Sequence, residues 1–166
     1  MKVIFLDIDG VLNREGTKER IEVECPDGSL ANGAIGVDAR LRDLLLGWLV
    51  ERPDVKIVLS STWRYLSETK KELEKNGISW IAETPSPGEI RGVYRAGIRG
   101  EEIQNVLENL SDQIEAYAIL DDLGSYSFLQ PQRRFLVQTS EKHGLQQKHL
   151  DMLDRILFPE KDEKTS

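Results

Sequence analysis

The sequence contains only one cysteine, Cys25, and two histidines. A lone cysteine cannot form an internal disulfide, and so few sulfur and imidazole ligands exclude a zinc-type cluster, so we expect a reducing, cytoplasmic environment. Long hydrophobic runs are also missing: the longest, at residues 44–50, is far shorter than the roughly 20 residues that cross a bilayer. Asp7 and Asp9 interrupt the apolar N-terminal segment before the hydrophobic region of a signal peptide can form. We therefore expect no membrane span and no cleaved signal.

Basic residues are fewer than acidic ones: 22 Lys and Arg stand against 29 Asp and Glu, which gives a net charge of −7. This balance argues against a broad electrostatic footprint for duplex nucleic acid, although it leaves room for a local basic rim. Hydrophobic residues make up 39% of the 166 residues, and the charged residues are scattered among apolar runs. The composition therefore predicts one compact domain, assigned to residues 1–158, and a charged tail at residues 159–166.

Short apolar segments alternate with helical patterns along most of the chain. Segments that end at polar residues predict buried strands at residues 3–6, 55–59, 116–120 and 135–137, with a weaker strand at residues 79–82. Amphipathic spacing predicts helices over residues 37–51, 65–75, 100–110 and 145–157. Strands that alternate with helices form βαβ units, so we expect an α/β fold: a three-layer, Rossmann-like parallel sheet with helices on both faces.

Two segments depart from this alternation. Residues 13–36 are polar and rich in glycine around a short alternating stretch, which predicts a flap or hairpin beside the first strand. Residues 84–97 contain several prolines and glycines, which indicates a surface loop. Neither segment is long enough to form a separate capping domain, so we expect a site with a minimal cap or none.

Two aspartates, Asp7 and Asp9, directly follow the first predicted strand. Ligands bind at the carboxyl ends of the strands in open parallel sheets, and a spacing of two residues puts both carboxylates on one side of an extended segment. Gly10 then allows the chain to turn sharply. A pair of surface turn residues is the alternative, because Asp-Gly is a common turn dipeptide, but the buried strand before the pair favours a functional site.

A second acidic pair, Asp121 and Asp122, follows another predicted strand. Three or four carboxylates at one sheet edge require a cation, and oxygen ligands without histidine favour Mg²⁺, which keeps several waters and can take a last ligand from a phosphate. Capping of a following helix is the alternative for Asp122, but it does not explain Asp121. We expect Mg²⁺ as cofactor and neither haem nor a nucleotide cofactor.

Hydroxyl residues and an arginine follow the strand predicted at residues 55–59: Ser60, Ser61, Thr62 and, after a tryptophan, Arg64. Hydroxyls, backbone N–H groups at a helix start and one arginine can together hold an anion. Ordinary helix capping by serine or threonine is the alternative. The position beside the acidic pairs favours the binding of a phosphate.

The three motifs together resemble, in order and spacing, those of the haloacid dehalogenase (HAD) superfamily of phosphotransferases. The similarity is greatest to the HAD domain of the Swiss Army Knife RNA repair proteins and extends over residues 1–157. It depends on Asp-Gly-Val-Leu-Asn at residues 9–13, Ser-Thr-Trp-Arg at 61–64, Arg-Gly-Glu-Glu-Ile at 99–103, Ile-Leu-Asp-Asp at 119–122, and Leu-Val-Gln-Thr at 136–139 with Gly-Leu at 144–145. The resemblance implies a HAD-type fold and phosphatase activity.

The third motif of this superfamily is a basic residue ahead of the next strand, often a lysine. No lysine lies between Lys75 and Asp121, so Arg99 fills this place by position, with Arg95 and Arg91 as alternatives. An arginine keeps its charge and can bind phosphate through two hydrogen bonds, so the electrostatic role is preserved. For the second motif, Ser60, Ser61 and Thr62 are all candidates, and Ser61 is preferred because the motif hydroxyl is usually followed by a small residue.

The chemistry expected from these residues is phosphate transfer through the protein. Asp7 attacks phosphorus in line and forms an aspartyl-phosphate. Asp9 protonates the leaving alkoxide and afterwards deprotonates the water that hydrolyses the intermediate. The remaining assignments are a metal site made of Asp7, Asp9 through its carbonyl, Asp121 and Asp122, and a phosphate site made of Ser61, Thr62, Arg64 and Arg99.

An open site suits a bulky phosphate ester, and the resemblance points to a 3′-phosphate end of RNA or DNA. Backbone contacts are then expected from Arg14, Arg64, Arg91 and Arg95, with a solvated charged rim as the alternative for these arginines. A phosphatase of nucleotides or other small molecules is the leading alternative function, with Trp63 or Tyr94 stacking on a base.

Two alternative functions do not involve hydrolysis. Receiver-type phosphoacceptor modules also have acids on a parallel sheet, but there the paired acids follow the first strand and the nucleophile a later one, the reverse of the order here. An inactive binding module would more often have lost Asp7 or Asp9. His143 and His149 are expected at the surface, Trp48, Trp63 and Trp80 in packing positions, and the oligomeric state is left open.

Overall fold

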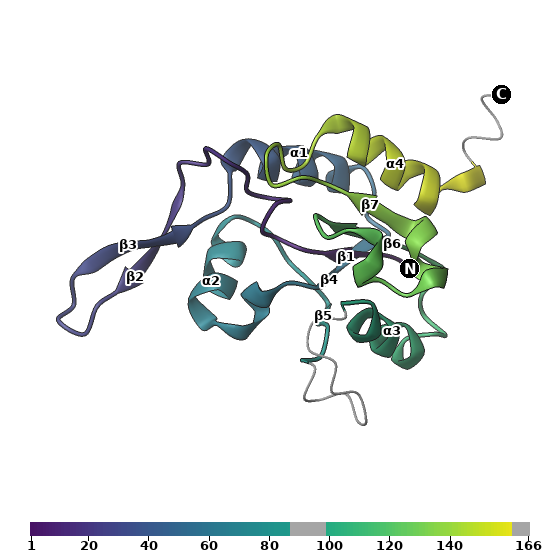
Figure 1. The fold of residues 1–166 in the computed structure, drawn as a ribbon, viewed down its shortest axis with the longest axis horizontal. Coiled ribbons are helices and arrows are strands. Elements are labelled where there is room, and N and C mark those ends of the chain that lie inside the picture. Colours follow the sequence, from purple (N-terminus) through teal and green to yellow (C-terminus); the bar gives the residue numbers. More distant parts are fainter. Residues whose placement is uncertain (87–98, 161–166) are drawn as a thin grey trace.

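The computed structural model describes residues 1–86 and 99–160, and a five-stranded parallel sheet forms its centre (Figure 1). Every neighbouring pair of strands is parallel. The strands, in spatial order, are β5 (Ala82–Glu83), β4 (Val55–Leu59), β1 (Lys2–Leu6), β6 (Ala116–Asp121) and β7 (Leu136–Gln138). All five predicted strands are present, although β5 begins at Ala82 rather than at residue 79.

Helices cover both faces of this sheet. They are α1 (Ala39–Val50), α2 (Ser67–Lys75), α3 (Arg99–Asn109) and α4 (Gln147–Leu157), with 3₁₀ turns η1 (Thr62–Tyr65), η3 (Ser125–Ser127) and η4 (Gln130–Phe135). Side chains alternate along β1: Ile4 and Leu6 enter a core shared with α1, α2 and α4, whereas Val3 and Phe5 enter a second core shared with α3. The predicted three-layer α/β architecture is therefore confirmed.

The segment between β1 and α1 forms an antiparallel hairpin of β2 (Arg20–Glu24) and β3 (Leu30–Ile35). It projects from the body of the molecule, away from the sheet (Figure 1). The prediction of a flap or hairpin in residues 13–36 is confirmed. The hairpin follows the loop that carries Asp9, so it begins close to the carboxyl end of the central strand.

The order of the strands places a crevice at the end of β1. From β1 the chain moves outward through β4 to β5, and then α3 returns it to β6 on the other side of β1. Hydrogen bonds continue past the strand ends, from Ser60 N to Leu6 O (2.8 Å) and from Asp7 N to Leu120 O (3.0 Å). The residues that follow β4, β1 and β6 consequently lie beside one another at a topological switch point, where α/β sheets bind ligands.

The remaining predictions concern membrane spans, the two histidines and the segments outside the sheet. No helix within residues 1–86 and 99–160 is long and apolar enough to span a bilayer. The prediction of a surface position is wrong for His149, which is buried and accepts a hydrogen bond at Nδ1 from Gln146 N (2.9 Å) at the start of α4, whereas His143 is exposed. Residues 87–97 of the predicted loop and 161–166 of the predicted tail lie outside the described residues, and the domain boundaries stay a prediction.

Candidate active site

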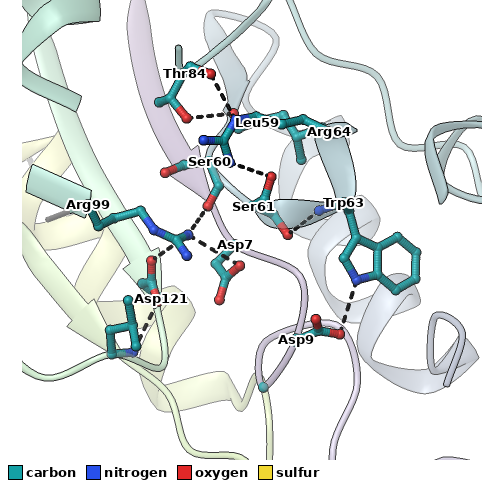
Figure 2. Close-up of polar contacts among 12 residues, drawn as sticks. Asp7, Asp9, Leu59, Ser60, Ser61, Trp63, Arg64, Thr84, Arg99 and Asp121 are labelled. Atoms are coloured by element: carbon teal, nitrogen blue, oxygen red, sulfur yellow. Dashed lines mark hydrogen bonds and ion pairs between the residues drawn. The ribbon is translucent and has the colours of Figure 1, made fainter. Parts of the chain in front are cut away.

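Asp7 is a buried carboxylate at the end of the central strand. Its Oδ1 lies 3.4 Å from Arg99 Nη1, and the same nitrogen lies 3.2 Å from Asp121 Oδ2 (Figure 2). Arg99 is the first residue of α3, the helix that returns the chain to β6, and its Nη1 also donates to the carbonyl oxygen of Ser60. One guanidinium therefore joins the carboxyl ends of β1, β4 and β6.

Arg99 thus lies beside Asp7, where the sequence predicts the basic residue of the third motif. Burial on its own lowers the pKa of Arg99, but the charges of Asp121 and Asp7 outweigh that effect and raise it above its ordinary value. Arg99 therefore remains a permanent cation beside Asp7. The other two candidates for this role, Arg91 and Arg95, lie outside the described residues, as does Tyr94.

Oxygen atoms of Asp7, Asp121 and Asp122 all lie within 4.8 Å of one another. Burial, and after it the charge of Asp121, raises the pKa of Asp7 well above its ordinary value, while Arg99 opposes this rise. Burial likewise raises the pKa of Asp121 to about 6, and Arg99 limits the shift. The raised pKa values of Asp7 and Asp121 show that Arg99 does not fully offset the effect of burying these two carboxylates.

This cluster fits a hard divalent cation. Its donors are carboxylate oxygens without histidine or sulfur, which is the ligand set that Mg²⁺ prefers. The side chain of Asp9 is not a member of the cluster, and the role of its backbone carbonyl as a metal ligand stays a prediction. A cation held there would favour the deprotonated forms of Asp7 and Asp121 and so oppose the rise in pKa that burial causes.

The loop after Asp7 needs glycine at position 10 for two reasons. Gly10 has a φ of +78°, a left-handed conformation that side chains disfavour, and an added Cβ would lie 2.3 Å from Asp122 Oδ2. The loop is fixed by hydrogen bonds from Gly10 N to Asn13 Oδ1 (2.9 Å) and from Thr139 Oγ1 to Gly10 O (2.6 Å). The acidic cluster and the turn are therefore packed directly against each other.

Asp9 is exposed, but two donors fix its carboxylate. Trp63 Nε1 donates to Asp9 Oδ1 at 3.1 Å (Figure 2), and Asn13 Nδ2 donates to the same oxygen at 2.9 Å. Both donors are on buried residues, whereas the second oxygen of Asp9 is not part of these bonds. The sequence predicted packing for Trp63 and gave no role to Asn13, so this orientation of Asp9 is a finding of the structure.

The candidate phosphate hydroxyls lie next to Asp7, at the end of β4. Ser61 is buried, and its Oγ accepts a hydrogen bond from Trp63 N (3.2 Å) at the start of η1 (Figure 2). Ser60 is also buried, and its Oγ has no hydrogen-bond partner within the described residues. Thr62 is exposed. The preference for Ser61 therefore stays a prediction, and the capping role weighed as its alternative is present in the structure.

Arg64 does not face the site as the sequence suggested. Its side chain is 4% exposed, and it donates to Thr84 O (2.8 Å), Ser61 O (2.6 Å) and Glu102 Oε2 (2.8 Å). Burial raises the pKa of Glu102, although the charge of Arg64 opposes the shift. Because its donors are used inside the protein, Arg64 holds the loops that follow β4 and β5 against α3 and is not available as a backbone contact for a substrate.

These features define a class of protein: an α/β enzyme-like fold whose parallel sheet ends in clustered carboxylates beside a half-buried arginine. Residues 3–150 match the model of the family described as the HAD domain in Swiss Army Knife RNA repair proteins. The chain belongs to this family and so to the HAD superfamily. Searches of curated proteins and of solved structures found no match. Membership supports phosphatase or hydrolase activity, and HAD domains typically use a divalent metal.

Metal binding is expected to depend on pH through this cluster. In the metal-free protein the folded pKa of Asp121, about 6, lies above its ordinary value of 3.8, so the associated stability is present at low pH and is lost as the pH rises toward 6. Mg²⁺ requires the deprotonated carboxylates and competes with these protons. Thermal unfolding with and without Mg²⁺ should show a small stabilisation at about pH 5 and a larger one at about pH 7.5. An equal Mg²⁺ effect at both pH values, or one retained by Asp121→Asn, contradicts the assignment.

Replacement of Gly10 by alanine is expected to damage the acidic cluster. The added methyl group must displace the carboxylate of Asp122 and also strain a residue at positive φ. We expect weaker Mg²⁺ binding, measured by calorimetry, and a loss of stability of about 1–3 kcal/mol from the strained backbone. Gly16→Ala is the matched control, because Gly16 has a similar φ of +84° but open space around its Cβ. If both variants bind Mg²⁺ equally well, Gly10 has no special part in the site.

Proposed function

We propose that this protein is a Mg²⁺-dependent phosphomonoester hydrolase that forms an aspartyl-phosphate on Asp7 and removes phosphate from the 3′ ends of RNA or DNA. The observation that carries the proposal is the setting of Asp7: a buried carboxylate at the switch point, 3.4 Å from Arg99 and clustered with Asp121 and Asp122. A carboxylate that attacks a phosphate dianion needs positive charge beside it, and this setting supplies one cation and the ligands for another.

Asp7 supplies the attacking oxygen. As its bond to phosphorus forms, the bond between phosphorus and the leaving oxygen breaks, which leaves the phosphoryl group on Asp7. Arg99 is placed to hold the Asp7 carboxylate and to stabilise the charge of the transferred group. Mg²⁺ bound at the cluster would supply further neutralisation of the negative charges that must meet.

Asp9 carries out the two proton transfers of the proposed reaction. It gives its proton to the leaving oxygen, and then, as a carboxylate, it takes a proton from the water that attacks the phosphorus of the intermediate, which restores Asp7 and releases phosphate. Trp63 and Asn13 hold Oδ1 of Asp9 from the side of the protein. Its exposure leaves the carboxyl group accessible to a leaving group and to water.

The substrate class is supported by the family and by the architecture. The matched family is described by its occurrence in RNA repair proteins, which suggests a damaged or cleaved nucleic-acid end as substrate. Between β1 and α1 the chain adds only the hairpin of β2 and β3 and no separate cap domain, which suits a bulky substrate such as a polymer end. A cytoplasmic location is part of the proposal and is compatible with the single free thiol of Cys25.

The test is Mg²⁺-dependent phosphate release from a matched panel: 3′-phosphorylated RNA and DNA oligonucleotides, 5′-phosphorylated versions of the same sequences, and mononucleotides. Asp7→Asn is the blank, because the amide keeps the shape of the side chain and is not a nucleophile. Release from 3′ ends that is lost in the blank supports the proposal. Phosphate release from mononucleotides alone would indicate a small-molecule phosphatase instead. If no phosphate is released from any of these substrates, the hydrolase assignment is refuted.

A further inference from the structure

A groove of about 880 Å³ lies between the first turns of α1 and α4 and the loop that follows β7. Its polar lining consists of Arg14, Arg40, His143, Gln146 and Gln147, with Asp43 as the one acid. Helices that follow parallel strands begin at the carboxyl edge of the sheet. The groove therefore opens at the same edge as Asp7, over the face that α1 and α4 cover (Figure 1).

The wall of the groove continues the catalytic loop. Asn13, which holds the carboxylate of Asp9, is followed directly by Arg14, whose backbone N–H donates to Thr17 Oγ1 (2.9 Å). The next residue, Glu15, donates its N–H to the carbonyl oxygen of Glu141 (2.8 Å), which ties this loop to the segment that leads to His143. The groove therefore begins directly after Asn13, the residue that contacts Asp9.

The charge of the groove is unlike that of the whole chain. The protein has a net charge of −7, yet two arginines, Arg14 and Arg40, line this one surface beside His143. Two nearby acids have cationic partners: Asp38 lies 3.3 Å from Arg14 Nε, and Asp43 lies 3.0 Å from Arg42 Nε. Arg40 and His143 are exposed, so their donors face solvent at the groove.

The lining combines the two arginines, Arg14 and Arg40, with apolar surface. Leu41, Leu44 and Leu145 lie between the polar residues, and glutamine side chains add donors and acceptors. A single nucleic-acid strand has complementary groups: charged phosphates that can pair with the arginines, separated by sugars and flat bases that can contact the apolar surface. Such a small cationic surface suits one strand better than a duplex, for which the acidic protein lacks a broad footprint.

We propose that this groove binds the sugar-phosphate backbone of a single strand, namely the nucleotides that precede the terminal phosphate at Asp7. The inference rests on the proposed function, because it assigns the groove to the polymeric part of the same substrate. Under this proposal Arg40 and His143, which are remote from the reacting atoms, determine the preference for a polymer over a mononucleotide.

The kinetic test compares kcat/KM for a 3′-phosphorylated oligonucleotide with kcat/KM for a nucleoside 3′-phosphate. We expect Arg40→Glu to lower this ratio by about tenfold, and Arg40→Ala to reduce the salt dependence of oligonucleotide turnover by about one unit of slope. Arg40 is the second residue of α1, where a glutamate favours the helix, so the variant is expected to fold. Arg155→Glu is the matched control, since Arg155 is exposed at the opposite end of α4.

A binding test separates this inference from the proposed function. Asp7→Asn and the double variant Asp7→Asn with Arg40→Glu are titrated into fluorescent single-stranded RNA and DNA oligonucleotides, and anisotropy is measured. Binding that weakens about tenfold in the double variant supports the groove even if no phosphate release is found with any substrate. Three results would overturn the inference: equal binding by the two proteins, the same kcat/KM ratio for Arg40→Glu as for Arg155→Glu, or no preference of the native protein for an oligonucleotide over a mononucleotide. None of these results would contradict phosphatase activity on mononucleotides.

Discussion

Asp9→Asn is expected to leave the phosphoryl group attached to Asp7. The amide oxygen can still accept the hydrogen bonds from Trp63 and Asn13, so the loop keeps its shape, but the side chain can no longer deprotonate water. An aryl phosphate has a leaving group that needs no proton, so it should still phosphorylate the protein. We expect one burst of aryl alcohol per active site, followed by turnover slower than that of the native protein by about 10²–10⁴-fold.

Rapid mixing measures the burst, and mass spectrometry of the quenched protein locates the phosphoryl group. Asp7→Asn is the control and should give no burst and no modified peptide. Trp63→Phe removes one donor to Asp9 and keeps an aromatic, smaller ring at this buried position, so we expect a decrease in kcat of no more than about tenfold and no trapped intermediate. Native-like turnover by Asp9→Asn, or a phosphoryl group on another residue, contradicts the assigned roles.

Much of the site follows from where apolar runs end in the sequence. Runs of valine, isoleucine and leucine predict β1, β4 and β6, and such runs form parallel strands buried on both faces. The register pairs Leu6 with both Leu59 and Leu120, so the polar residues after these strands must meet at one edge. Asp7 and Asp121 were therefore predictable as neighbours, and Arg99 was predictable because it begins the helix that returns the chain to β6.

Other contacts depend on tertiary geometry that no local pattern encodes. Trp63 and Asp9 are separated by 54 positions, and the indole N–H meets the carboxylate only because η1 and the loop after β1 pack together. The burial of Arg64 depends on Glu102 of α3 in the same way, so a surface arginine was the natural expectation. His149 differs, because residues 149, 153 and 157 recur every four positions along α4 and form its buried stripe, a signal already present in the sequence.

Arg99→Ala is expected to weaken both the fold and the chemistry. Arg99 Nη1 lies within 3.4 Å of Asp7 and 3.2 Å of Asp121, both buried, so its loss leaves their charges without a partner. Removal of one member of a buried ionic group costs about 3–5 kcal/mol, and loss of a group that stabilises transition-state charge lowers kcat by about 10²–10³-fold. Arg99→Lys keeps a cation but cannot form two parallel hydrogen bonds as a guanidinium does, so we expect it to retain part of the stability and part of the activity.

The loss of stability in Arg99→Ala should depend on pH and on metal. Asp121 has a pKa of about 6, and without Arg99 the pKa values of Asp121 and Asp7 are expected to rise further, so protonation relieves the uncompensated charge at low pH. Urea unfolding should therefore show the largest deficit near neutral pH in EDTA, a smaller one at about pH 5, and partial recovery with Mg²⁺. Arg133→Ala is the control, because exposed Arg133 donates to Ser125 O and Phe128 O away from the cluster. A deficit that is the same at both pH values and insensitive to Mg²⁺ would mean that Arg99 stabilises the protein by packing, and that the charge balance around Asp7 has another source.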